Sequence, residues 1–275
     1  MTLMASLCSR AEVEARLRVL LPPEYHGIYQ DLRATPMRGA GLQFDAEGRV
    51  AWNRIWQSFC DLAIAGGPPH KGRLLEPGAA AGIAEAPDAH LDVLDELARG
   101  VTMASELRTD ESPHLGWIRV VCHSDVMAGW MYRAITQENV AVRREGRALD
   151  LPAAPTFRVG KEIKNVVTVV AKTTHYWMGH IPREQRIIIG DLLARMDDEA
   201  PLVEPHWTDA GTAQWWAVPC ASVAEALRLM QTLLTVNVLA RREDTTLLVA
   251  VDPVHDPDGH RREAAAAWAR SMSDT

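Results

Sequence analysis

An internal repeat is the sequence feature that most constrains the fold. Residues 117–149 align without gaps with residues 215–247, and 11 of the 33 aligned positions are identical. Unrelated segments of this length would share roughly 2 identities, so the alignment predicts two copies of one supersecondary unit. The identical pairs, 98 residues apart, are Trp117/Trp215, Val120/Val218, Cys122/Cys220, Ser124/Ser222, Ala128/Ala226, Asn139/Asn237, Val140/Val238, Arg143/Arg241, Arg144/Arg242, Glu145/Glu243 and Leu149/Leu247.

Each copy has the apolar spacing of a strand, a helix, two strands and a second helix. In the first copy we expect strands at 117–122, 140–144 and 148–151, with helices at 125–138 and 161–177; the second copy runs in step, with its last helix near 259–271. Strand–helix–strand crossovers are right-handed, so the helices should cover one sheet face. The predicted fold class is α/β (α+β), with two tandem ferredoxin-like β-α-β-β-α repeats after a mostly helical N-terminal region.

The domain prediction follows from the repeat. It assigns residues 1–110 to a mostly helical region with one β-hairpin, 114–180 to the first repeat, 181–212 to a connecting helix and linker, and 213–275 to the second repeat. In the N-terminal region, Ser9 and Glu12 form a capping-box pattern that predicts a helix over 10–21. A second helix is expected over 52–64, where Trp52, Trp56, Phe59 and Cys60 share one face.

Charge and apolar content exclude several classes of partner. The formal net charge is −7, which disfavours general attraction to nucleic acids and to anionic membranes. No apolar run approaches the roughly 20 residues needed to cross a bilayer, and the first residues do not resemble a secretory signal. The four cysteines include no C-x-x-C pair. We therefore expect a cytoplasmic protein with reduced thiols and no nucleic-acid or membrane partner. The sequence does not identify a cofactor.

Several of the repeated polar residues have structural interpretations. Asn139 and Asn237 end their predicted helices, where asparagine tolerates the left-handed conformation, and Ser124 and Ser222 stand where an N-cap is expected. We favour these roles over ligand binding. For the repeated Arg-Arg-Glu at 143–145, cross-strand pairing is favoured over substrate contact.

A basic helix face in the first repeat is the main candidate for ligand binding. Lys161, Lys164 and Lys172 fall on one arc of the helix predicted over 161–177, and no acidic residue is expected to face them. Such a face can bind an anion, although a solvated surface would look the same. The second copy has alanines at the corresponding place, so the site would belong to the first copy alone.

The glycine-rich segment 66–73 is a second candidate. Its glycines could expose backbone amides, and His70, Lys71 and Arg73 add donors suited to a phosphate or carboxylate. The spacing is not that of a P-loop. The alternative is a loop that only ends the preceding helix.

Three residues are candidates for chemistry. His175 and Tyr176 can exchange protons, and Cys122 precedes a helix start, where the pKa of a thiol can fall, although buried packing is the favoured interpretation. His175 and His180, five residues apart, cannot share a ligand on a continuous α-helix. The acidic loop 252–260 matches no known metal motif and is interpreted as a turn with capping acids, so no metal site is predicted.

These features lead to two functional hypotheses. The first is that the protein binds a small anionic metabolite between the N-terminal region and the first repeat; whether it also transforms that metabolite is left open. The alternative is a non-catalytic assembly or regulatory protein, with the duplicated sheets as a partner interface and a homo-oligomer as one outcome. A pocket lined by the two basic segments would favour the first, and a flat exposed apolar patch the second.

Overall fold

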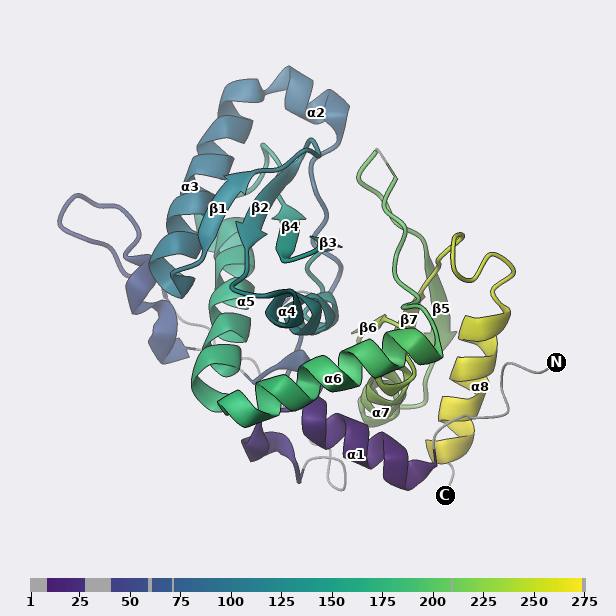
Figure 1. Ribbon diagram of the computed structural model, residues 1–275. Helices are drawn as coiled ribbons and strands as arrows, with labels where there is room; N and C mark the ends of the chain where they lie inside the picture. The colour runs from purple at the N-terminus through teal and green to yellow at the C-terminus, as the bar shows by residue number, and fades with distance from the viewer. Residues whose placement is uncertain (1–8, 28–40, 59–60, 71, 209, 274–275) are drawn as a thin grey trace.

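The computed structural model describes residues 9–27, 41–58, 61–70, 72–208 and 210–273, without the side chains of 56–58, 272 and 273. It is a mixed helical and sheet structure with two small antiparallel sheets, of four and three strands (Figure 1). Among the described residues, no helix has the length and apolar character needed to cross a bilayer.

The two aligned stretches contain the same elements in the same order. The first has β2 (Trp117–Val121), α4 (Asp125–Gln137), β3 (Arg143–Glu145) and β4 (Ala148–Pro152). The second has β5 (Trp215–Pro219), α7 (Val223–Thr235), β6 (Ala240–Glu243) and β7 (Thr246–Ala250). Their strand orders correspond, β2-β4-β3 and β5-β7-β6, with all pairs antiparallel.

The first sheet has one further strand. β1 (Arg108–Glu111) pairs antiparallel with β2 and occupies the edge beyond it. This strand lies where the sequence predicted the boundary between the N-terminal region and the first repeat. The predicted domain limits themselves stay a prediction, although residues from both sides of this boundary belong to one hydrophobic core.

The repeated Ser residues begin helices and the repeated Asn residues end them, as expected. The hydroxyl of Ser124 accepts from the backbone N–H of Met127 at 3.1 Å, and that of Ser222 accepts from Glu225 at 3.1 Å. Asn139 and Asn237 have φ of 58° and 61°, in the left-handed region just after helices α4 and α7. These shared residues therefore satisfy the same backbone requirements in both stretches.

A Trp–Arg contact is also common to both stretches. The guanidinium of Arg143 lies 5.7 Å from the ring centroid of Trp117, and that of Arg241 lies 4.7 Å from the ring centroid of Trp215. Both pairs have the geometry of a cation–π contact between a tryptophan that begins one strand and an arginine at or next to the start of another. Packing within each sheet is therefore sufficient to explain why these residues occur twice.

The N-terminal region confirms one predicted helix and corrects another. Helix α1 (Arg10–Leu20) begins with the expected capping box of Ser9 and Glu12. The helix predicted over 52–64 is instead two 3-10 segments, η3 (Trp52–Ser58) and η4 (Ala63–Ala65). Trp52 is fully buried, whereas the side chains of Trp56, Phe59 and Cys60 lie outside the described residues. The hairpin expected over 42–51 is a turn closed by one bridge, between Phe44 and Val50.

The remaining helices surround the sheets. A 3-10 turn, η1 (Pro23–Tyr25), follows α1, and α2 (Ala80–Glu85) and α3 (Pro87–Ser105) precede β1. After the first sheet, one continuous helical stretch contains a π-helical turn η5 (Val159–Ile163), α5 (Lys164–His175) and a second π-helical turn η6 (Tyr176–His180). Helix α6 (Arg183–Glu199) connects the two stretches, and α8 (His260–Ser273) ends the fold.

Helix α5 is buried on almost every side. It packs against both α3 and α4, and its valines are buried, as are Thr168 and Lys172 on the basic arc. The expectation that this arc faces solvent was wrong from Thr168 onward, because residues 61–70 of the N-terminal region lie against it.

Replacing Asn139 tests the left-handed position after α4. Asn139→Ala should lower the free energy of unfolding by about 2 kcal/mol, because alanine is strained at positive φ and the hydrogen bond from Nδ2 to the Arg242 carbonyl, 2.7 Å, is lost. Asn139→Gly should cost less, since only the hydrogen bond is lost. Chemical denaturation measures both. Glu106→Gly is a control, because Glu106 is an exposed residue with φ of 60° after α3; this change should not lower the free energy of unfolding. Equal losses for Asn139→Ala and Asn139→Gly would contradict the interpretation.

Candidate functional site

The candidate site is organised around a buried loop, residues 61–70. Loops normally run over the surface because their backbone polar groups need partners. Here long polar side chains from both repeated stretches and from α5 supply those partners. Glu138 accepts from the Ala63 N–H at 2.7 Å, Lys172 donates to the Asp61 carbonyl at 3.3 Å, Gln231 donates to the Ile64 carbonyl at 2.7 Å, and Arg242 donates to the Gly67 carbonyl at 3.4 Å.

The strongest of these groups form a buried ion pair. Lys172 Nζ lies 2.7 Å from Glu138 Oε1, and both side chains are fully buried. Burial raises the pKa of Glu138, while Lys172, the Ala63 amide and Arg242 oppose that rise. The expectation that no acid faces the three lysines was therefore wrong for Lys172, because Glu138 comes from a different helix end that the helical arc alone does not reveal.

His70 lies beside this ion pair. Its Nε2 is 3.9 Å from Glu138 Oε2, and neither atom has a hydrogen-bond partner among the described residues. Burial, followed by the charges of Lys172 and Lys164, lowers the pKa of His70 well below its usual value. His70 is thus a neutral imidazole in the folded protein.

The other predicted ligand-binding residues are arranged differently. Lys164 is half-buried and near enough to His70 to lower its pKa, whereas Lys161 is exposed and lies 3.9 Å from Glu162. Arg73 is exposed, and Lys71 lies outside the described residues. The two basic segments do approach one another. The anion that lies between them is the carboxylate of Glu138, so the protein itself supplies a negative charge at this place.

The glycines of the loop have a conformational role. Gly66 has φ of 96°, and a Cβ on Gly67 would lie 2.2 Å from the Asp61 carbonyl oxygen. The loop therefore turns back on itself too closely for a side chain. The amide of Ala63 that this turn presents is bound by Glu138, so the interpretation of the segment as an open anion loop is not supported by its geometry.

A second polar group lies at the C-terminal end of α5. The hydroxyls of Tyr176 and Tyr25 are 2.5 Å apart, and the Tyr25 hydroxyl donates to Asp61 Oδ1 at 2.8 Å. Since a carboxylate only accepts, the protons run in one direction, from Tyr176 to Tyr25 to Asp61. Burial, together with Tyr176 and Asp61, raises the pKa of Tyr25, so Tyr25 remains a neutral donor.

Two imidazoles lie beside these tyrosines. His175 and His180 contact through their Nε2 atoms at 3.0 Å, and His180 Nδ1 lies 2.6 Å from Glu24 Oε1. The sequence indicated that residues five apart could not meet on an α-helix. They meet because η6 is a π-helical turn, whose larger number of residues per turn brings positions i and i+5 to one face. Partial burial and the neighbouring His180 lower the pKa of His175.

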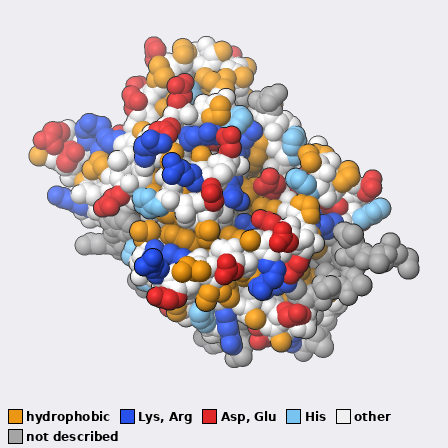
Figure 2. Space-filling view, viewed as in Figure 1, with side chains coloured by type: hydrophobic (Ala, Val, Ile, Leu, Met, Phe, Trp, Pro, Cys, Tyr) orange, Lys and Arg blue, Asp and Glu red, His pale blue; other side chains and the backbone are white. Residues whose placement is uncertain are grey.

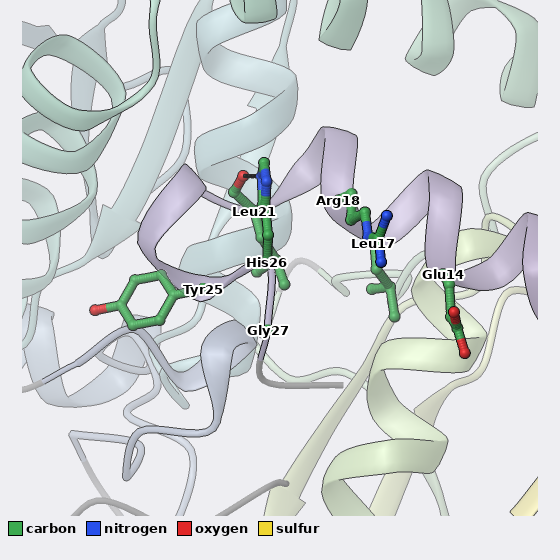
Figure 3. A pocket seen from close by; sticks show the side chains of 7 residues that line it. All are labelled: Glu14, Leu17, Arg18, Leu21, Tyr25, His26 and Gly27. Atoms are coloured by element: carbon green, nitrogen blue, oxygen red, sulfur yellow. Dashed lines mark hydrogen bonds between the residues drawn. The ribbon is translucent and has the colours of Figure 1, made fainter. Parts of the chain in front are cut away.

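A small cavity adjoins this polar group. It measures about 90 Å³ and is lined by Glu14, Leu17, Arg18, Leu21, Tyr25, His26 and Gly27. In Figure 3 Tyr25 lies at one end of the set, with its hydroxyl directed away from the other lining residues. The ring of Tyr25 therefore separates the cavity from the hydroxyl chain. None of the predicted ligand-binding lysines lines this cavity.

Cys122 has the properties of a buried core residue. Its Sγ lies 3.9 Å from Met131 Sδ, and burial raises the pKa of the thiol to about 12. The helix that follows does not offset this burial, so the thiol stays protonated at neutral pH. Cys122 therefore has no place in the site that we describe.

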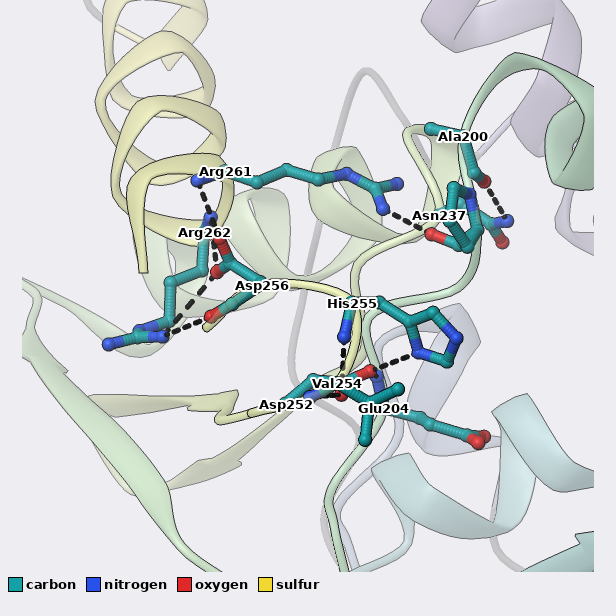
Figure 4. Close-up of polar contacts among 10 residues, drawn as sticks. Ala200, Glu204, Asn237, Asp252, Val254, His255, Asp256, Arg261 and Arg262 are labelled. Carbon is teal, nitrogen blue, oxygen red and sulfur yellow. Dashed lines mark hydrogen bonds and ion pairs between the residues drawn. The ribbon is translucent and has the colours of Figure 1, made fainter. Parts of the chain in front are cut away.

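The acidic loop 252–260 caps its own backbone (Figure 4). Asp252 accepts from the amides of Val254 and His255 at 2.9 and 3.0 Å, and Asp256 accepts from those of Arg261 and Arg262 at 2.9 and 3.1 Å. This arrangement stabilises the turn and the start of α8. Within the described ranges, no three His, Cys, Asp or Glu side chains are placed to hold a metal ion.

Sequence reasoning missed Glu138, Asp61 and Tyr25. One signal for Glu138 was present: position 236, its counterpart in the second stretch, is a valine, so the carboxylate appears in the first stretch only. No signal marked Asp61 or Tyr25. Their contacts span 36 to 151 residues of sequence, and no local pattern extends that far.

Breaking the buried pair should destabilise the fold. Lys172→Met and Glu138→Gln should each lower the free energy of unfolding by about 3–5 kcal/mol, because each leaves one buried charge without its partner. The double variant should lose much less than the sum. Chemical denaturation of all three measures this coupling. Lys161→Met is the matched control, for which we expect a change within about 0.5 kcal/mol; an equally small change for Lys172→Met would contradict the assignment.

The buried neutral His70 should make stability fall in acid. In the unfolded chain a histidine has a pKa of about 6.5, whereas the pKa of His70 is much lower in the folded protein. Below pH 6.5 or so, the unfolded state therefore binds a proton that the folded state does not, and the free energy of unfolding decreases by up to about 1.4 kcal/mol per pH unit. Denaturation curves measured from about pH 7.5 to about pH 5 bracket the pKa of an unperturbed histidine. Over this range the free energy of unfolding should fall more steeply for the native chain than for His70→Gln. Identical slopes would show that His70 titrates normally.

Comparison with known proteins gives no family assignment. No family model, no curated protein and no solved structure matches the chain. The function is therefore inferred from the contacts of the residues described above.

Proposed function

We propose that the protein binds a small molecule with an anionic group between the N-terminal region and the first repeat, and that it moves a proton there. The observation that carries this proposal is the hydroxyl chain from Tyr176 through Tyr25 to Asp61, with O–O distances of 2.5 and 2.8 Å. It joins side chains from both regions. A π-helical turn forms one side of it, and such turns are frequent at functional sites.

The imidazole pair supplies a base beside this chain. The lowered pKa of His175 keeps its ring neutral at pH 7, so that it can accept a proton. His180, held by Glu24 at 2.6 Å, can orient that ring through their contact at 3.0 Å. The Tyr176 hydroxyl gives its one proton to Tyr25, so towards a substrate bound against this pair its oxygen accepts a hydrogen bond, and His175 is the group that takes up a proton.

Charge attraction to the ligand is assigned to Lys161 and Lys164. Both lie on the helical stretch that contains Tyr176, 15 and 12 residues before it and therefore roughly 18 Å or more away along the axis, so they attract an anion to this side of the molecule rather than contact a small ligand at Tyr176. Lys161 is exposed. Lys172 is left out of this role, because its ammonium group is neutralised by Glu138. The ligand-binding proposal thus retains part of the basic face that the sequence indicated.

We also propose that the two sheets arose by duplication of one ferredoxin-like unit. The 11 identities in 33 positions and the matching strand orders support this. On this proposal the first unit acquired the N-terminal region, and with it the site, whereas the second unit kept the sheet and its helices.

An assembly function is the second candidate. Ile187 and Ile188, neighbours on α6, are 60% and 50% exposed, and Met178 shortly before them is 47% exposed. Exposed apolar side chains that adjoin one another are typical of partner surfaces. This apolar set lies on η6 and α6 and not on the sheets, so it would suit a different interface from the one the repeat indicated.

Replacing Tyr176 tests the ligand-binding proposal. A thermal-shift screen of small carboxylates and phosphate monoesters should give a ligand that raises the melting temperature of the native chain. Tyr176→Phe removes one hydroxyl from the chain of hydrogen bonds and should weaken binding of that ligand about tenfold, the loss typical of a buried hydrogen bond to a ligand.

Two histidine variants provide the comparison, one at the proposed site and one far from it in the fold. His175→Gln should also weaken binding, whereas His255→Gln, in the loop that precedes α8, should leave it unchanged. If a ligand is found and neither Tyr176→Phe nor His175→Gln alters its affinity, the site lies elsewhere. If no anion in the screen binds, the anionic-ligand proposal fails and the assembly function gains support.

A further inference from the structure

Strand β5 at the edge of the second sheet has no neighbour in the place where the first sheet carries β1. In the first sheet β1 pairs antiparallel with β2, and Asp110 is the register partner of Arg119. β5 is the counterpart of β2, and Ala217 corresponds to Arg119. Among the described residues, no strand pairs with the outer side of β5, which is the first strand in the order β5-β7-β6 (Figure 1). The position is therefore occupied in one sheet and open in the other.

The path of the chain explains this difference. Each stretch is preceded by a residue that bridges, in parallel, to the residue after the left-handed asparagine: Leu75 to Val140, and Val203 to Val238. From Leu75 the chain continues through α2, α3 and β1 before it enters β2. From Val203 it reaches β5 with no helix or sheet strand between them in the part of the chain that the structure describes. The second sheet therefore lacks the segment that supplies a fourth strand.

The backbone groups at the centre of β5 point away from the sheet. Cys220 donates to the Thr245 carbonyl at 2.9 Å, and Val251 donates to the Gln214 carbonyl at 3.3 Å, so the even-numbered residues of this segment bond to β7. In an antiparallel ladder, the residues between them direct their N–H and C=O groups to the other side. Ala217 therefore presents its amide and its carbonyl at the open edge, and this residue is exposed.

The two ends of β5 limit how much of the edge can pair. Pro219 has no N–H, and its carbonyl accepts from Arg270 of α8 at 3.2 Å. At the other end lies a turn that is closed by the bridge between Trp207 and Ala213. Pairing with another strand is therefore centred on Ala217.

β5 is also the one sheet edge without a charged residue among the strands that the structure describes. The other three edge strands each contain arginine and acidic side chains: β1 has the sequence Arg-Thr-Asp-Glu, β3 Arg-Arg-Glu and β6 Ala-Arg-Arg-Glu. β5 has the sequence Trp-Trp-Ala-Val-Pro. Figure 2 shows Lys, Arg, Asp and Glu side chains together over the part of the molecule that holds the first sheet. Charges on an edge strand oppose its pairing with another chain, so β5 alone among these edges is suited to it.

We propose that β5 pairs antiparallel with β5 of a second copy of this chain, which joins the second sheets of the two copies into one continuous sheet. An antiparallel pair of identical strands has a twofold axis, so each residue meets a complementary one. Ala217 lies opposite Ala217 of the partner subunit, and Trp215 lies opposite Pro219 of the partner subunit. Only apolar side chains come together, so no like charges oppose each other. The strands left at both ends of the joined sheet are β6, which is charged.

The contact is small and separate from the other proposals. Two short strands bury a modest area, so the dimer should be in equilibrium with the monomer. The inference does not depend on the proposed function, because Tyr25, Tyr176 and His175 lie outside β5. It also differs from the assembly surface on η6 and α6, whose exposed apolar residues do not belong to the sheet.

Sedimentation equilibrium of the full chain tests the proposal. Between about 1 µM and about 1 mM, the native chain should change from the mass of one chain to that of two. Ala217→Pro removes the outward N–H but no hydrogen bond to β7, so the dissociation constant of the dimer should rise about tenfold or more, since two intermolecular hydrogen bonds are lost. Ala217→Arg gives the second sheet the residue that the first has at position 119, and it places like charges opposite one another. The dissociation constant should again rise about tenfold, and by less at high salt.

Ala84→Arg and Ile188→Arg are the matched controls. Ala84 is an exposed alanine of α2, and Ile188 belongs to the exposed apolar set of η6 and α6. Neither change should alter the dissociation constant. The proposal is overturned if the native chain stays monomeric over the whole range, or if Ala217→Pro and Ala217→Arg, both folded by circular dichroism, dimerise as tightly as the native chain. It is equally overturned if Ala84→Arg or Ile188→Arg weakens the dimer as much as Ala217→Arg, since the interface would then not be β5.

Discussion

The buried carboxylate of Glu138 is the interaction on which the rest of the structure depends. It binds the ammonium group of Lys172 and the amide of Ala63, both at 2.7 Å, and all three residues are buried. Through these two contacts it holds helix α4, helix α5 and the loop 61–70 together. An uncompensated charge in such a place is costly, so each partner requires the other two. The N-terminal region is thus joined to the first sheet by polar contacts as well as by apolar packing.

This constraint also determines where ligand chemistry can occur. Lys172, which looks like part of an anion site in the sequence, is directed inward to the carboxylate of Glu138, and His70 is kept neutral beside this pair. The polar groups that remain nearer the surface are the histidine pair at the π-helical turn and the arginines at the edge of the first sheet. Our ligand-binding proposal therefore concerns the C-terminal end of α5, and it retains Lys161 and Lys164 of the basic face but not Lys172.

The repeat helps to separate stability from function. Positions that are identical in both stretches cap helices, adopt positive φ, or stack an arginine on a tryptophan. Positions that differ include Glu138 against Val236 and Arg119 against Ala217, and these build the internal ion pair and the charged sheet face of the first stretch alone. Identity between the two stretches thus reflects requirements of the backbone, whereas the buried ion pair and the charged sheet face lie where the stretches differ.

The sequence by itself determined the local structure: the order of strands and helices in each repeat, the capping residues, and the left-handed asparagines, because these depend on contacts between residues close in the chain. It did not determine that 52–64 would form two 3-10 segments, that Lys172 would be buried, or that His175 and His180 would meet. Those outcomes were decided by the tertiary structure. The loop 61–70 is stabilised by side chains far away in the sequence, and the π-helical turn by packing around it, so neither leaves a periodic pattern that a sequence can reveal.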